Sequence, residues 1–336
     1  MKYYQFLLVL IYSLLVFSGV IMFELWWQVE YLYYSNINIR DMLHYNQLLE
    51  GHNTRYVLVY PVYWLSSVTG LERHYLFSIV IMLLIFTTSK LTSLTLVRLG
   101  NISESSARVL SLLFFGSLSL VMNGRIVFAV LAMSWFIWLF VCWYSGVRLK
   151  ARTVLLSCVS ILWLSSVSSG TFSVIYVAIV TWLAWVAVRV ASNLFLSLRD
   201  LRISIVLVVC LLISSPLFFS YLDKNMSYYN YSMQAMLEHG VGNIFFFDGL
   251  ASVIILLSII SFACLLYFGV FLYFRSQKPV LILLAIGLFG GLFGYSTLVM
   301  SVPPLFIITI SMLSRYVTSP RYGKQREDVV MNYNSY

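Results

Sequence analysis

Charged residues are scarce in this chain of 336 residues, since only 10% are charged while 61% are hydrophobic. Soluble domains carry about 25% charged residues, so this composition cannot cover a water-facing surface. Apolar runs of about 20 residues recur along the chain, and that is the length a helix needs to cross a bilayer. These two features exclude a soluble fold and predict an all-α polytopic membrane protein.

Cysteine and the common catalytic motifs are also sparse. The four cysteines, Cys142, Cys158, Cys210 and Cys264, all fall inside apolar runs without the spacing of a metal site, so we expect packing residues and neither disulfides nor a metal. The chain has no P-loop, zinc motif or nucleophile elbow, which argues against ATP-driven and metal-dependent chemistry and predicts no cofactor. The net charge of +9 is a topology signal and does not indicate nucleic-acid binding.

Ten apolar segments are predicted to span the membrane. They are 6–23, 76–97, 107–122, 126–144, 153–168, 173–188, 203–221, 250–274, 279–299 and 304–314, with a tight turn at Ser301–Pro304 between the last two. The further apolar stretch 57–69 is too short to span and contains Pro61, so we interpret it as a re-entrant or interfacial segment.

Lysine and arginine orient these spans, because both are retained in short cytoplasmic loops. Fifteen of the 21 fall in the predicted inner segments, Lys90 falls within a span, and Arg40, Arg55, Arg73, Arg125 and Lys224 remain outside. Both termini are therefore predicted to be cytoplasmic. We expect one transmembrane domain over 1–314, with long outer loops at about 24–75 and 222–249, and a disordered polar cytoplasmic tail over 315–336.

All four histidines and eight of the twelve carboxylates fall on the predicted outer side, so the chemistry is expected there. In the first outer loop, residues 39–50 predict a helix on which Asp41 and His44 are neighbours one turn apart. A carboxylate beside an imidazole can remove a proton from a sugar hydroxyl. The alternative is that both residues form the solvated face of a helix lying in the membrane interface.

The turn Asn123-Gly124-Arg125 lies at the outer end of two closely spaced spans, directly before a predicted helix. The guanidinium and the free N–H groups of the helix terminus could together bind an anion, and pyrophosphate is the obvious candidate. The alternative is a plain turn whose arginine reaches up to the interface. Lys90, near the cytoplasmic end of its span, is interpreted either as such a cation or as a substrate contact.

The second outer loop is rich in aromatic residues and contains Glu238, His239 and Asp248. Aromatic faces can stack on sugar rings, and any of the three ionisable residues could act as the base or orient the substrate. Tyrosine, tryptophan and phenylalanine at this depth also anchor membrane proteins at the interface, and that alternative stays open.

Three segments carry a resemblance to a known group of proteins. Asp41-x-x-x-Tyr45, Tyr60-Pro61-Val62-Tyr63, and Asn123-Gly124-Arg125 followed by Ala129, together with the pattern of spans over about 1–190, resemble the EpsG and Wzy families of bacterial polysaccharide polymerases. The resemblance implies that undecaprenyl-pyrophosphate-linked oligosaccharide repeat units are joined at the outer face of the bacterial inner membrane. It also implies that Arg125 holds the donor pyrophosphate while Asp41 and Tyr45 line the site.

The chain departs from these families in one turn, where relatives often carry a histidine and this chain reads Ser168-Ser169-Gly170-Thr171-Phe172. The identity of the base therefore stays open among Asp41, His44, Glu238 and His239. Arg125, Asn123 and Arg55 are the candidate pyrophosphate ligands, and Tyr45 and Asp248 the candidate sugar contacts. The expected partners are the lipid-linked oligosaccharide, the bilayer and a chain-length regulator, with no nucleic acid. The rival hypotheses are a flippase for a lipid-linked glycan and a glycosyltransferase that uses a polyprenyl-phosphate sugar.

Overall fold

The computed structural model describes residues 2–24, 54–99, 102–119, 124–147, 149–192, 198–228, 230–231 and 295–318. Every regular element in these ranges is an α-helix. The helices are α1 (Lys2–Met22), α4 (Thr54–Thr69), α5 (Arg73–Leu99), α6 (Glu104–Ser119), α7 (Gly124–Tyr144), α8 (Ala151–Ser165), α9 (Ser169–Ser192), α10 (Leu198–Tyr228) and α14 (Tyr295–Thr318). Helices α5, α7, α9 and α10 are long and apolar enough to cross a membrane. The predicted spans 250–274 and most of 279–299 lie outside the described residues.

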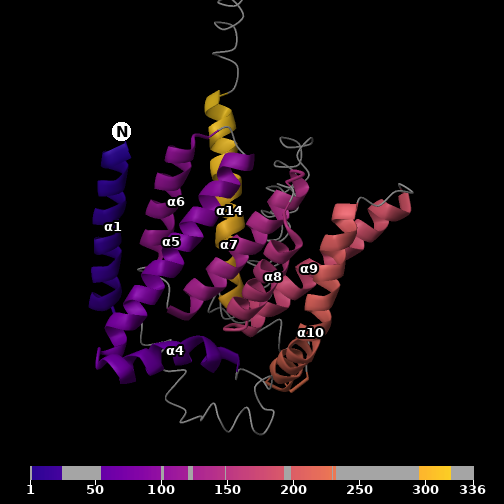
Figure 1. Ribbon diagram of the computed structural model, residues 1–336, viewed down its shortest axis with the longest axis horizontal. Coiled ribbons are helices and arrows are strands. Elements are labelled where there is room, and N and C mark those ends of the chain that lie inside the picture. The colour runs from indigo at the N-terminus through magenta and orange to yellow at the C-terminus, as the bar shows by residue number, and fades with distance from the viewer. Residues whose placement is uncertain are drawn as a thin grey trace, which may run out of the picture.

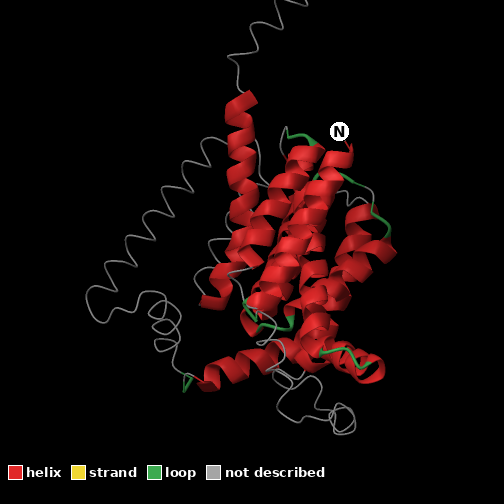
Figure 2. Cartoon of the chain, turned by 90° about the vertical axis from the view of Figure 1, so that its left-hand side faces the viewer, coloured by secondary structure: helices red, strands yellow, loops and turns green. Residues whose placement is uncertain are grey.

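The long helices run side by side in an up-and-down bundle, seen from two directions in Figures 1 and 2. The beginning of α1 and the end of α14 lie at the same end of this bundle, which we call the N-terminal end (Figure 1). Helix α4 lies at the opposite end and runs across the bundle instead of along it (Figure 1). We call that end the α4 end. A crosswise helix of 16 residues is compatible with the interfacial segment predicted for 57–69.

Helix α7 is the centre of the bundle. Of its spanning window 83% is buried, against 22% for α10 at the periphery. Its sequence is apolar on all sides, as expected for a helix that is surrounded by other helices. It packs against α5, α8, α9 and α14, and its side chains make up much of the main hydrophobic core. The start and the end of α7 are therefore held in place by several neighbours.

Helix α10 packs against α8 and α9, and a hydrogen bond near each of its ends also joins it to the bundle. At the N-terminal end, Nε1 of Trp143 on α7 donates to the Asp200 carboxylate at 3.0 Å. At the α4 end, the fully buried Tyr221 hydroxyl donates to the Ser166 carbonyl at 2.6 Å, in the turn between α8 and α9. Only a small fraction of α10 is buried, so these two bonds matter for its attachment. Breaking a hydrogen bond that is buried or that involves a charged group lowers stability more than breaking an exposed neutral one.

Helix α14 corrects one prediction. The turn predicted at Ser301–Pro304 is wrong, because α14 continues as a single helix through Pro303 and Pro304. Prolines inside membrane helices are tolerated when neighbouring helices hold the broken hydrogen-bond ladder in place. Both prolines are buried here, and Phe306 stacks on Phe114 of α6 with ring centroids 4.2 Å apart.

Helices α1 and α6 approach closely at a glycine. The Tyr12 hydroxyl of α1 donates to the Leu113 carbonyl at 2.7 Å and lies 2.8 Å from Oγ of Ser117. The ring passes over Gly116, where an added Cβ would lie 2.2 Å from Tyr12 Cε1. The glycine is thus required by the partner helix, in the manner of other close contacts between membrane helices.

Replacing Gly116 by alanine should lower the thermal stability of the purified protein, although alanine favours a helix over glycine by about 1 kcal/mol. The added Cβ forces the Tyr12 ring away from both of its hydrogen bonds, and each is worth about 1 kcal/mol. The control is the same substitution in a Tyr12→Ala background, where the space is open and the helix propensity should raise the melting temperature. A stabilising Gly116→Ala with Tyr12 present would contradict this packing.

Candidate functional site at the α4 end

Helix α4 is held against the bundle by a small apolar cluster of its own. Val59 and Val62 are buried there with Leu76 and Phe77 of α5, Phe128 of α7, and Val167 of the turn between α8 and α9. Three chain segments far apart in the sequence therefore meet under α4. Because Val59 and Val62 are three residues apart, one face of α4 is buried and the opposite face, with Tyr60, Trp64 and Val68, is exposed.

The start of α7 lies beside this cluster. Helix α7 begins at Gly124, so Arg125 stands in its first turn, where the backbone N–H groups have no partner within the helix. Phe128, a member of the α4 cluster, follows Arg125 by three residues. Since residues three apart share a helix face, position 125 lies on the same side of α7 as Phe128. The positive end of the α7 dipole is consequently directed toward the α4 end of the bundle.

The corner between α4 and α5 brings a second guanidinium to the same end. Arg73, the first residue of α5, lies over the ring of Tyr63 on α4, with its Cζ 4.4 Å from the ring centroid. Tyr63 in turn meets Phe77 edge to face, with the centroids 6.3 Å apart. A cation over a tyrosine face is attracted by the ring quadrupole, by about 0.5–1 kcal/mol at exposed sites. The contact links α4 to the first residue of α5.

An imidazole and a carboxylate are paired at this corner. Nε2 of His74 lies 3.1 Å from Oε2 of Glu72, and the His74 ring packs against Tyr75 with centroids 4.0 Å apart. The His74 side chain is 26% exposed and Glu72 69%, so the pair is open to a substrate. Such a pair can accept a proton from a hydroxyl group. Both residues were predicted to lie outside but not to form a site, although their i, i+2 spacing next to the end of an apolar stretch was a usable signal.

The turn between α8 and α9 forms another wall of this end. It is tight, with Ser168 N donating to Ser165 O at 3.0 Å and Ser166 Oγ donating to Trp163 O at 2.6 Å. Phe172 meets the ring of Tyr221 edge to face at 5.5 Å. The serines use their side chains to satisfy backbone carbonyls, so this turn serves as a rigid support.

The end of α10 also lies here and carries an acidic group. The Tyr231 hydroxyl donates to the Asp223 carboxylate at 3.0 Å. The hydrogen bond to this carboxylate raises the pKa of Tyr231 above its ordinary value, because losing the proton would place two negative charges side by side. Tyr231 therefore stays a neutral hydrogen-bond donor throughout the physiological pH range.

Among the residues predicted to form the site, the structure locates the backbone of two. Arg125 is in the first turn of α7 and Arg55 in the first turn of α4. The others lie outside the described residues, and their roles stay predictions. They are Asp41, His44, Tyr45, Asn123, Glu238, His239 and Asp248.

No protein-family model matches this chain, and comparisons with curated proteins and with solved structures find no match. An arginine in the first turn of α7 suits an anionic group, and the Glu72–His74 pair suits a hydroxyl that must lose a proton.

Proposed function

We propose that this protein joins oligosaccharide repeat units carried on undecaprenyl pyrophosphate into a bacterial surface polysaccharide. The observation that carries the proposal is the apolar cluster to which α4 and the start of α7 both contribute. The segments Tyr60-Pro61-Val62-Tyr63 and Asn123-Gly124-Arg125 are separated by about sixty residues, yet Val62 and Phe128 belong to one apolar cluster. These segments carry the resemblance to the EpsG and Wzy polymerases, and their proximity supports a shared site.

The distribution of charge supports the orientation. Most lysines and arginines of the described residues stand at helix ends on the N-terminal side of the bundle, among them Arg98, Arg108, Arg152, Arg202 and Arg315. The α4 end holds few basic residues in the described ranges: Arg55, Arg73, Arg125 and Lys224. By the positive-inside rule the N-terminal end faces the cytoplasm and the α4 end faces outward. The lipid-linked donor would then reach the site from the outer leaflet.

Glycosyl transfer to a sugar hydroxyl needs two groups. The bond between the anomeric carbon and the pyrophosphate oxygen breaks, so negative charge develops on the leaving group, and the acceptor oxygen loses its proton as it bonds to that carbon. Arg125, assisted by the N–H groups of α7 and by Arg55 and Asn123, stabilises the leaving pyrophosphate. Asp41, His44, Glu238 and His239 remain the candidate bases from the outer loops.

The Glu72–His74 pair is added to these candidates by its geometry. The carboxylate holds the imidazole at 3.1 Å and would stabilise the imidazolium that forms when His74 accepts the acceptor proton. Tyr45 and Asp248 are proposed to contact the sugar. The site is thus assembled from the first outer loop, the α4–α5 corner, the start of α7 and the second outer loop.

Loss of the protein should leave single repeat units on the cell surface and abolish the ladder of long polysaccharide chains on a gel, and a plasmid copy should restore the ladder. This experiment separates the proposal from its rivals. Repeat units that accumulate on the cytoplasmic side would indicate a flippase. A ladder of normal length with one sugar missing would indicate a transferase that adds a single residue.

A further inference from the structure

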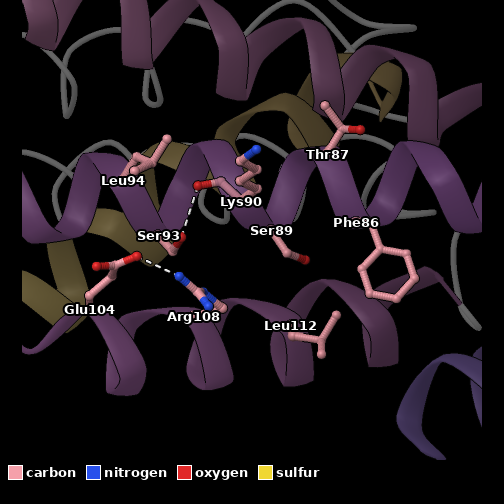
Figure 3. Close-up of a pocket in the computed structure, with 9 residues that line it drawn as sticks. All are labelled: Phe86, Thr87, Ser89, Lys90, Ser93, Leu94, Glu104, Arg108 and Leu112. Carbon is pink, nitrogen blue, oxygen red and sulfur yellow. Dashed lines mark hydrogen bonds and ion pairs between the residues drawn. The ribbon is translucent and has the colours of Figure 1, made fainter. Parts of the chain in front are cut away.

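A pocket of about 470 Å³ lies between α5 and α6 (Figure 3). It is in the half of the bundle nearer the N-terminal end, because Glu104 and Arg108, which line it, stand in the first turns of α6. Its volume falls within the roughly 300–1,000 Å³ that is usual for small-molecule sites. The two helices run antiparallel along it, and Glu104 and Arg108 of α6 lie in the space between them (Figure 3). Lys90 of α5 and Arg108 line the pocket from the two sides.

Lys90 is an uncommon residue at its depth. It precedes the end of α5 at Leu99 by nine residues, which places its Cα about 13 Å from that end of the helix at 1.5 Å per residue. A cation at the centre of the bilayer costs about 2.5–3.5 kcal/mol, and the cost remains appreciable at this depth. Among the residues that the structure describes, no carboxylate pairs with the Lys90 ammonium, since Glu104 is paired with Arg108 one turn later on α6.

The remaining polar groups of the pocket are occupied by the protein itself. Oγ of Ser89 donates to the Ser111 carbonyl at 3.3 Å, and Oγ of Ser93 donates to the Lys90 carbonyl at 2.8 Å. The charged lining therefore amounts to two cations and one carboxylate. An anion with oxygen acceptors is the ligand that this lining would stabilise, and a phosphate diester offers oxygen atoms that both kinds of cation bind.

The wall beside the charges is apolar. Phe86, Leu94 and Leu112 complete the pocket. The face of α5 that carries Lys90 exposes further large apolar side chains, Leu83 and Val97, each seven residues from Lys90. In a membrane-spanning bundle such surfaces face acyl chains, so the pocket joins a charged interior to a lipid-facing exterior. A ligand with an anionic head and apolar chains matches both parts.

We infer that this pocket binds the phosphate of an anionic phospholipid from the leaflet at the N-terminal end. Basic pockets between membrane helices on the cytoplasmic side bind anionic lipid head groups in this way. Lys90 and Arg108 hold the phosphate, and the acyl chains lie along Phe86 and Leu112 toward the bilayer. The inference does not depend on the proposed glycosyl transfer, and its test requires no assay of polysaccharide.

The test measures lipid retention by the purified full-length protein, using native mass spectrometry with phosphatidylglycerol as the anionic probe and phosphatidylcholine as the neutral one. The wild-type protein should retain phosphatidylglycerol in preference. Lys90→Met and Arg108→Gln should each weaken this retention about tenfold, because each removes one charge-assisted hydrogen bond. Arg98→Gln is the matched control, because Arg98 is an exposed cation on the last turn of the same helix and does not line the pocket.

Glu104→Gln gives a second test with the opposite sign. It removes the pocket's one carboxylate and frees Arg108, so retention of phosphatidylglycerol should become severalfold stronger. A merely structural role for the Glu104–Arg108 pair does not predict this gain. Equal retention of the two lipids, an unchanged Lys90→Met protein, weaker retention after Glu104→Gln, or displacement of the lipid by millimolar inorganic phosphate would each overturn the inference.

Discussion

Replacing Arg125 by alanine should abolish long polysaccharide chains while the protein stays in the membrane at its normal level. Removing one donor that stabilises developing charge typically lowers a rate by about 10²- to 10³-fold, and a polymer of many units cannot form at that rate. Arg125→Lys should leave a shortened ladder, because the lysine keeps the charge but loses the planar fork that binds two phosphate oxygens at once. The measurement is the ladder on a gel beside an immunoblot of the membrane fraction.

The position of Arg125 makes a structural explanation of this loss testable. A cation in the first turn of a helix opposes the helix dipole by about 0.3–1 kcal/mol, and alanine is the best helix former. Arg125→Ala should therefore leave the melting temperature of the purified protein unchanged or raise it. Arg98→Ala, an exposed arginine at the other end of the bundle, is the control and should keep a full ladder. A full ladder with Arg125→Ala contradicts the assignment of the pyrophosphate site.

Much of the helical architecture was predictable, because the length of an apolar run and the periodicity of its apolar residues can be read from neighbouring residues alone. The predicted spans 76–97, 126–144 and 203–221 lie within α5, α7 and α10, which are long and apolar enough to cross a membrane. The prediction of a turn in α14 was wrong because proline normally ends a helix. Here packing between helices that are distant in the sequence keeps Pro303 and Pro304 within α14. Such packing has no signature in a window of neighbouring residues.

The candidate site was less accessible to prediction, because it depends on which segments meet. The sequence predicted an outer cation at Arg125 beside a helix start, and of these two points the start of α7 at Gly124 confirms the helix start. The approach of α4 to Phe128 and Val167 is a tertiary contact that no spacing encodes. The Glu72–His74 pair was not predicted for a related reason. The two side chains come together at the corner between α4 and α5, and the sequence does not show that corner.

Two attachments give the α4 end its rigidity, and they act on different elements. The apolar cluster joins α4 to residues of α5, of the start of α7 and of the turn after α8, while the Tyr221 hydrogen bond joins the end of α10 to that turn. A site that stabilises a transition state must hold its groups within a fraction of an ångström. If the proposed transfer occurs here, detaching α4 should therefore impair it even when no charged residue is changed.

Replacing Val62 by aspartate should detach α4 and abolish the polysaccharide ladder. Val62 is 8% exposed in the α4 cluster, and an unpaired carboxylate placed there costs several kcal/mol, more than the roughly 1.5–3 kcal/mol that burial of a valine contributes. The matched control is Val68→Asp, the same change on the same helix at a position that is 63% exposed. That variant should keep α4 docked and the ladder intact.

The docking of α4 can be measured separately from polymer formation, through the accessibility of a cysteine introduced at position 59. Val59 is 3% exposed in the same cluster, and the nearly isosteric Val59→Cys should resist a maleimide in a background whose four native cysteines are replaced by alanine. Adding Val62→Asp should expose this thiol, whereas adding Val68→Asp should not. A protected thiol and a full ladder in the Val62→Asp protein would contradict the packing of α4. A labelled thiol with a full ladder would instead show that α4 is dispensable for the proposed transfer, because the two readouts respond to different parts of the hypothesis.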